Sequence, residues 1–339
     1  MNRRYFFSCL LRPGAFVPAL LLVLLLTSAC GNRRKALLPN VSGKAGEVIV
    51  VMDKAYWNGP FGQLLRDSLA ADCPFLPQKE PLYNLADVPP ASFSKLFQLH
   101  RNLILCEVSP QVEKADIHFG NDVWATPQCV VRINAPDEET AIQLCRENMT
   151  HIINYIEMAE RKRVIDNTRK YQESALRPPV KAVFGGSPYF PSGYVLKKIN
   201  DRFAWIAYET TYVNQAILIY QFPAVGDESD FSRQTLVEHR NEMMKEEVPG
   251  MFENSYMTTS TFAEPALRFV KYEGRYFAEL RGYWEVFNDF MGGPFVSHSF
   301  YSPDGKRVIT VESFVYAPKF DKRHYLRQVE SLLYSWSEE

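Results

Sequence analysis

The stretch FVSHSFYSPDGKRVITVESFVY, residues 295–316, decides the fold class of this chain. It contains two runs rich in β-branched and aromatic residues, 295–302 and 307–316, which are separated by a Pro-Asp-Gly segment at 303–305. Runs of this composition on either side of turn residues are typical of two antiparallel strands. The sequence therefore predicts a hairpin here and an antiparallel sheet around it.

The rest of the C-terminal half continues the same pattern. Further strands are predicted at 194–199, 202–210, 216–222, 255–263, 266–272 and 276–286. Apolar residues at helical spacing predict a helix at 232–247 and a closing amphipathic helix at 322–336. Because strands dominate and helices accompany them, we expect an α+β fold rather than a wound α/β sheet.

The N-terminal half also predicts strands that are followed by a helix. The β-branched run at 47–52 is typical of a buried strand. A long helix is expected to start at 134–139, where Asn, Pro and acidic residues favour an N-terminus, and to run toward Tyr171. We therefore expect two domains, 46–176 and 177–339, each a mainly antiparallel sheet with helices packed on one side.

The first residues have the pattern of an export signal. A positive head is followed by an apolar run at 15–26, which is shorter than the ~20 residues that a membrane-spanning helix needs. Small residues then precede Cys30. This order resembles the bacterial lipoprotein signal, in which the cysteine is diacylated, the leader is removed before it, and the new amine is acylated. Thr27 departs from that pattern, because an aliphatic residue is more usual there.

The resemblance predicts how the mature chain is held. Residues 1–29 would be the signal peptide, Cys30 would carry lipid, and 30–45 would be a polar tether. Several acyl chains together give stable membrane attachment. No acidic residue closely follows the cysteine, and by resemblance to known sorting signals this implies the periplasmic face of the outer membrane. The alternatives are an uncleaved N-terminal anchor and a plain signal peptide with a chance cysteine.

Composition excludes two classes of protein. The 38 Lys and Arg residues nearly balance the 39 Asp and Glu residues. The net charge of −1 therefore lacks the excess of positive charge that a nucleic-acid-binding protein needs. A protein with several membrane spans is excluded too, because the one long apolar run lies at the very start. The content of 46% hydrophobic and 23% charged residues is that of an ordinary globular chain.

The cysteines allow two interpretations. Those that remain in the body of the mature chain are Cys73, Cys106, Cys129 and Cys145. In an exported domain they are candidates for at least one disulfide, whose pairing the spacing does not decide. The alternative is small buried thiols, since Cys106 and Cys129 lie within apolar, strand-like runs. No closely spaced set of Cys and His favours a metal site.

Catalytic signatures are missing from the sequence. It has no nucleophile elbow, zinc-binding helix motif, phosphate loop or dinucleotide-binding turn. The six histidines are scattered without ligand spacing. We therefore expect no metal and no cofactor.

Two segments are candidates for contact with a ligand. Asp53 and Trp57 follow the first predicted strand and precede a helix, where polar groups often meet ligands. Trp284 and Asp289 lie in the aromatic segment 283–293, and aromatic faces beside Asp and Asn suit a sugar or a peptide. The alternatives are a solvated turn aspartate for the first segment and aromatic residues packed in a sheet core for the second.

Several stretches carry a resemblance to a known family. The segments 292–301 and 314–323, together with 46–52 and 100–104, resemble a family of bacterial envelope lipoproteins that is described as a domain of unknown function. The resemblance spans nearly the whole mature chain and implies an envelope location without an activity. Separately, the order of elements in the C-terminal half is similar to the fold of the photosystem-II extrinsic proteins and their Mog1-like relatives, which implies a binding or assembly module.

The resulting expectation is a non-enzymatic envelope lipoprotein. Its lipid on Cys30 would hold it at the membrane, and its domains would bind a protein, peptide or glycan partner. The alternative is a periplasmic hydrolase whose carboxylates, Asp53, Glu285 and Asp289 first among them, converge on folding. A third reading, a spacer with no concave site, would carry neither function.

Overall fold

The computed structural model describes residues 37–338. The predicted signal peptide, Cys30 and the first part of the predicted tether lie outside these residues. The last part of that tether is attached to the fold, because Asn40 and Ser42 form bridges with Thr126 and His100. From Pro39 onward the chain belongs to one compact unit, which contains two sheets.

The first sheet is mixed, with the strand order β2-β1-β3-β5-β4. Its strands are β1 (Glu47–Val51), β2 (Asn84–Val88), β3 (Asn102–Val108), β4 (Asp116–Asn121) and β5 (Cys129–Ala135). The neighbours β2, β1, β3 and β5 pair in parallel, and only β4 runs antiparallel to β5. The expected antiparallel pairing is therefore wrong for this sheet. Segments that contain helices return the chain between β1, β2 and β3, and β4 itself returns it between β3 and β5, so these strands start in the same direction.

One long helix dominates the face of the first sheet. The helices of this part are α2 (Lys54–Asn58), α3 (Pro60–Leu69), α4 (Lys95–Gln98) and α5 (Glu138–Lys170), with a 3₁₀ turn at Pro90–Ser92. Asp137 caps α5 by accepting a hydrogen bond from the backbone N–H of Thr140, and two glutamates follow in the first turn. These features favour a helix start, so the predicted long helix is confirmed. Apolar residues of α3 and α5 share one core with β1, β3 and β5.

The second sheet is antiparallel throughout, with the order β10-β11-β12-β13-β8-β7-β6 and β9 paired to β11. Its strands are β6 (Val195–Ile199), β7 (Phe203–Glu209), β8 (Asn214–Pro223), β9 (Tyr256–Thr259), β10 (Ala266–Tyr272), β11 (Arg275–Phe287), β12 (Gly292–Tyr301) and β13 (Arg307–Tyr316). Phe295 of β12 faces Phe314 of β13 in the register. The hairpin predicted from residues 295–316 is thus confirmed.

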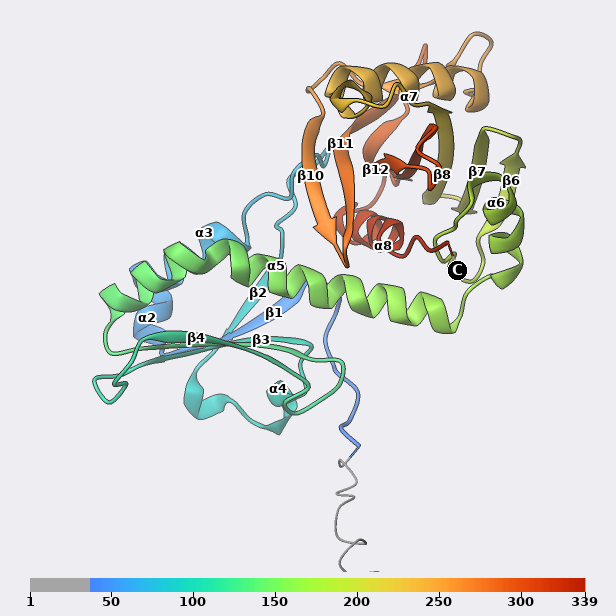
Figure 1. Ribbon diagram of the computed structural model, residues 1–339. Helices are drawn as coiled ribbons and strands as arrows, with labels where there is room; N and C mark the ends of the chain where they lie inside the picture. Colours follow the sequence, from blue (N-terminus) through green and yellow to red (C-terminus); the bar gives the residue numbers. More distant parts are fainter. Residues whose placement is uncertain (1–36, 339) are drawn as a thin grey trace, which may run out of the picture. The chain divides into compact units, whose positions relative to one another are not determined.

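Helices cover both faces of the second sheet (Figure 1). They are α6 (Arg177–Phe184), α7 (Arg233–Glu247) and α8 (Arg323–Leu333), with 3₁₀ turns at Ser174–Leu176 and Glu228–Phe231. Helix α7 contributes Leu236 and Met243 to the core on one face, whereas α8 contributes Leu326 and Val329 to the core on the other. The α+β class is confirmed, but the helices are not confined to one side, because the central strand β13 is buried on both faces.

None of the helices between residues 37 and 338 combines the length and the apolar character of a membrane span.

Candidate functional site

The four predicted contact residues do not form one site. Asp53 is exposed just before α2, and Trp57 is half-buried under the guanidinium of Arg66, whose central carbon lies 4.7 Å from the ring centre. Both follow strand β1 of the first sheet. Asp289 belongs to the turn between β11 and β12 of the second sheet and accepts a hydrogen bond from the backbone N–H of Phe290.

Trp284 is a core residue, which makes the predicted contact role wrong. Only 2% of its surface is exposed, and its ring packs against Phe314 and Tyr316 at centroid distances of 5.2 and 6.1 Å. The position on β11 turns its side chain toward the core that the sheet shares with α7. The alternative interpretation of this segment, aromatic residues packed into the sheet, holds for Trp284.

The four cysteines of the described chain are free thiols, which contradicts the disulfide interpretation of the sequence. Cys106, Cys129 and Cys145 are buried in the first core, and Cys73 is half-buried. Cys129 on β5 faces Asn102 on β3, so Cys106 lies four residues farther along β3, or about 13 Å. A disulfide needs Cα atoms within about 7 Å. Small buried thiols are the interpretation that fits.

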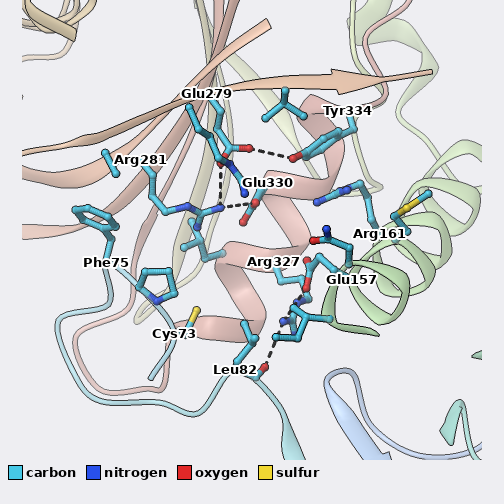
Figure 2. A pocket seen from close by; sticks show the side chains of 18 of the residues that line it. Cys73, Phe75, Leu82, Glu157, Arg161, Glu279, Arg281, Arg327, Glu330 and Tyr334 are labelled. Atoms are coloured by element: carbon cyan, nitrogen blue, oxygen red, sulfur yellow. Dashed lines mark hydrogen bonds and ion pairs between the residues drawn. The ribbon is translucent and has the colours of Figure 1, made fainter. Parts of the chain in front are cut away.

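A cavity of about 530 Å³ lies between α5, the β10–β11 hairpin, α8 and the segment that contains Cys73, Phe75 and Leu82 (Figure 2). None of the three carboxylates suggested for a hydrolase, Asp53, Glu285 and Asp289, lines it. Its walls combine apolar side chains such as Met158 and Leu326 with the charged side chains of arginine, lysine and glutamate residues.

Cations outnumber carboxylates in the cavity wall. The charged residues are Arg161, Arg268, Lys271, Arg281, Arg323 and Arg327 on one side and Glu157, Glu279 and Glu330 on the other. Each carboxylate is already paired with an arginine. The N···O distances are 3.0 Å for Glu157 with Arg327, 2.7 Å for Glu279 with Arg268 and 2.5 Å for Glu330 with Arg281. The wall therefore keeps an excess of positive charge after internal pairing.

Glu279 is the most enclosed of these carboxylates, with 1% of its surface exposed. The Tyr334 hydroxyl donates a hydrogen bond to it at 3.0 Å, and His298 Nε2 lies 3.4 Å away without hydrogen-bond geometry. Burial raises the pKa of the Glu279 carboxyl, but His298, Arg281 and Arg268 lower it by more, so this pKa lies well below its ordinary value. The group is therefore an ionised partner of its cations.

Arg161 differs from the other cavity arginines because its guanidinium has no acceptor. The side chain is 7% exposed, and its Nε is buried without a hydrogen-bond partner. No ion pair or hydrogen bond joins the guanidinium of Arg161 to any residue of the described chain. Its central carbon lies 3.6 Å from the centre of the Tyr334 ring and 5.8 Å from that of Tyr272. The Glu157 carboxylate, whose pKa Arg161 helps to lower, already accepts hydrogen bonds from Arg327 and Tyr83.

The guanidinium of Arg161 has the chemistry that receives a carboxylate. A guanidinium offers five N–H donors in a planar fork that matches a carboxylate. Leaving the buried Nε–H of Arg161 without an acceptor costs about 1–3 kcal/mol, and more for a charged group. The Tyr334 ring packs against the Arg161 guanidinium, and Figure 2 shows the two side chains next to each other at the cavity.

Comparisons with known proteins identify two segments. Residues 173–335 match a family model described as "Domain of unknown function (DUF4837)", and residues 41–169 match one described as "Domain of unknown function (DUF8532)". The expected resemblance to domains of unknown function is confirmed at this level. A search of curated proteins found no match. Among solved structures, the chain is similar to a mutant of the protein Mog1, with 10% identity and a TM-score of 0.29 over 45% of this chain and 90% of that one.

Proposed function

We propose that this protein is a lipid-anchored binding protein of the bacterial envelope, and that its cavity takes an anionic group of a protein, peptide or glycan partner. One observation carries the proposal: the buried guanidinium of Arg161 lines a cavity and lacks an acceptor within the described chain. A carboxylate brought by a partner would supply that acceptor and would relieve the cost of the unpaired, buried Nε–H.

The charges of the cavity favour binding over hydrolysis. A general acid at neutral pH needs a carboxyl group whose pKa is raised, and a general base needs a free carboxylate within reach of the substrate. Burial raises the pKa of Glu157, but Arg327 and Arg161 lower it by more, so the net direction is downward, as it is for Glu279. Glu330 is held by Arg281. The carboxylates of the wall therefore serve as ion-pair partners of arginine.

The test of the cavity is direct titration of the mature protein in detergent. The probe is 4-phenylbutyrate, an apolar body with one carboxylate, and its neutral amide is the control ligand. We expect 4-phenylbutyrate to bind and the amide to bind at least about tenfold more weakly, because only the carboxylate fits the guanidinium. The Arg161→Gln variant should lose a similar factor. Equal binding of acid and amide, or an unaffected Arg161→Gln variant, would refute the site.

A matched control comes from the same helix. Lys162 is the next residue of α5, its side chain is 71% exposed, and it pairs with Asp166 on the surface. Lys162→Gln removes the same formal charge from the protein without touching the cavity. We expect this variant to bind 4-phenylbutyrate as the wild type does, which separates the Arg161 contact from the effect of overall charge.

The lipid anchor of this proposal rests on the order of charged head, short apolar run, small residues and cysteine at the N-terminus. Its test is the Cys30→Ala substitution in cells fed an alkyne-labelled fatty acid. We expect the label to disappear and the protein to move from the outer-membrane fraction to the soluble fraction. Unchanged membrane retention of Cys30→Ala would contradict the anchor and leave the cavity proposal intact.

A further inference from the structure

An unpaired strand edge adjoins the Arg161 cavity. Strand β10 is the outermost strand of the second sheet and pairs only with β11. Ala266, Arg268, Val270 and Tyr272 of β10 all line the cavity. The outer edge of this strand therefore runs along the cavity rim.

The hairpin turn decides which backbone groups of β10 point outward. Glu273 and Gly274 both have positive φ, 46° and 82°, which is the two-residue mirror-image turn of tight hairpins. Such a turn is closed by a hydrogen bond between its flanking residues, here Tyr272 and Arg275, which face each other in the register. Along β10, residues that form backbone hydrogen bonds with β11 then alternate with residues that do not.

The alternation leaves three residues with outward backbone groups. Tyr272, Val270 and Arg268 direct their N–H and C=O groups to β11, so Leu267, Phe269 and Lys271 direct theirs away from the sheet. No backbone group of residues 37–338 forms a hydrogen bond with these outward groups. A row of donors and acceptors of this kind is the template on which an extended chain adds as a new strand.

The C-terminal end of strand β10 lies next to Arg161. Tyr272 is the last residue of β10, and the Arg161 guanidinium carbon is 5.8 Å from its ring centre. Tyr334 covers the same end, with its ring 4.9 Å from that of Tyr272, and Arg275 donates hydrogen bonds to the backbone carbonyls of Tyr334 and Trp336. A strand added to β10 is therefore stopped at this end, next to a guanidinium without an acceptor.

We infer that the partner presents the extended C-terminal segment of a polypeptide, which adds to the outer edge of β10 and places its terminal carboxylate on Arg161. The inference rests on the proposed function and names its ligand class. With its carboxyl end at Tyr272, the added strand runs parallel to β10. Alternate side chains of that strand face the cavity, where Phe75, Met158 and Val270 offer apolar contact, so apolar residues at alternate positions suit it.

The experiment compares two forms of one peptide on the mature protein in detergent. The probe is acetyl-Thr-Val-Thr-Val-Thr-Val with a free carboxylate, and the control is the same peptide as its C-terminal amide. We expect the acid to bind and the amide to bind at least about tenfold more weakly. Equal binding of the two forms would overturn the role of the terminal carboxylate.

A matched pair of variants tests the strand pairing itself. Phe269→Pro removes one outward N–H at an edge position where proline breaks no bond to β11, and Phe269→Thr removes the same ring but keeps the N–H. We expect the peptide acid to bind Phe269→Pro at least about tenfold more weakly than Phe269→Thr. Equal binding by the two variants would overturn strand addition.

The small probe keeps this failure distinct from a failure of the cavity. Phe269→Pro should still bind 4-phenylbutyrate, which also shows that the variant is folded. If 4-phenylbutyrate binds to the wild type and the peptide acid does not, the inference is wrong and the anion site stands. Binding of tri-galacturonate in place of the peptide would overturn the inference in favour of an acidic glycan. If none of these anions binds, the proposed function fails as well.

Discussion

Arg240 of α7 and Glu312 of β13 form an ion pair in which neither side chain is exposed to solvent. Arg240 Nη2 lies 2.8 Å from one carboxylate oxygen, Nε lies 3.0 Å from the other, and the Tyr220 hydroxyl donates to the same group at 3.2 Å. The pair joins the helix to the centre of the sheet, so the two elements are held by polar contacts as well as by apolar packing.

Removing one member of this pair should be far more damaging than removing both. Arg240→Met leaves the Glu312 carboxylate buried without its cation, and we expect the free energy of unfolding to fall by about 3–5 kcal/mol. The double variant Arg240→Met/Glu312→Leu should lose distinctly less, because no unpaired charge is left in the core. Urea denaturation of the three proteins measures this. A double variant as unstable as Arg240→Met would contradict the explanation.

Arg161 and Arg163 should respond in opposite ways to the same substitution. Arg163 donates hydrogen bonds to the carbonyls of Pro127 and Arg101 and to the side chains of Asn102 and Glu160, so Arg163→Met should cost about 3 kcal/mol or more. Arg161→Met removes a guanidinium that has no acceptor, together with its contacts to the rings of Tyr334 and Tyr272. We expect the free energy of unfolding to stay within about 1 kcal/mol of the wild type or to rise. Chemical denaturation without ligand decides this, and a large loss for Arg161→Met would show a structural role.

Ionisation of Glu279 should make the free energy of unfolding depend on pH in the acidic range. Because its pKa is well below the ordinary value of 4.5 in the folded protein, the unfolded chain binds its proton first as the pH falls. Its contribution is therefore fully present above about pH 5 and is lost progressively below 4.5. His298, whose pKa is lowered by burial, acts in the same direction below its ordinary 6.5.

The measurement is the free energy of unfolding of wild type and Glu279→Gln between pH 7 and pH 3. The variant should be less stable than the wild type at pH 7 and should lose less stability in acid, since it cannot take up that proton. Glu253→Gln, on an exposed loop, serves as the control and should follow the wild type. Parallel curves for wild type and Glu279→Gln would contradict the assignment of the acid dependence to this carboxyl.

The thiols should be unreactive in the folded protein. Burial raises the pKa of Cys129 and of Cys145 to about 12 and that of Cys73 to about 11, and it raises the pKa of Cys106 as well. Iodoacetamide at pH 8 should therefore label Cys73 slowly and the other three only after unfolding. Without reductant, peptide mass analysis of the unfolded protein should find all four labelled. Protection of two cysteines until reduction would show a disulfide after all.

The sequence allowed the second sheet to be predicted better than the first. Runs of β-branched and aromatic residues between turn residues mark the antiparallel strands locally, as in the hairpin at 295–316. In the first sheet, β1 and β3 are continuous apolar runs, which show burial but not direction. Their parallel pairing depends on how the intervening segments cross the sheet, and no local spacing records that.

The cavity was missed because its key residue lies in a charged run. Glu160-Arg161-Lys162-Arg163 has the composition of a solvated helix end, yet only Lys162 is exposed. A signal was present: Ile152, Ile156 and Glu160 follow one another at four-residue spacing, so the buried face of α5 continues into the charged run. The partner elements β10 and α8 come more than a hundred residues later, and only folding brings them to this helix face.

The walls of the cavity come from both of the segments that match family models. Residues 41–169 supply Arg161 and Glu157, whereas residues 173–335 supply the β10 edge and Tyr334. Either segment alone would carry half of the proposed site: residues 41–169 would have Arg161 without the strand edge, and residues 173–335 the strand edge without Arg161. Recognition at the proposed site would depend on both segments, and a changed placement of one segment on the other would abolish it even where each stayed folded.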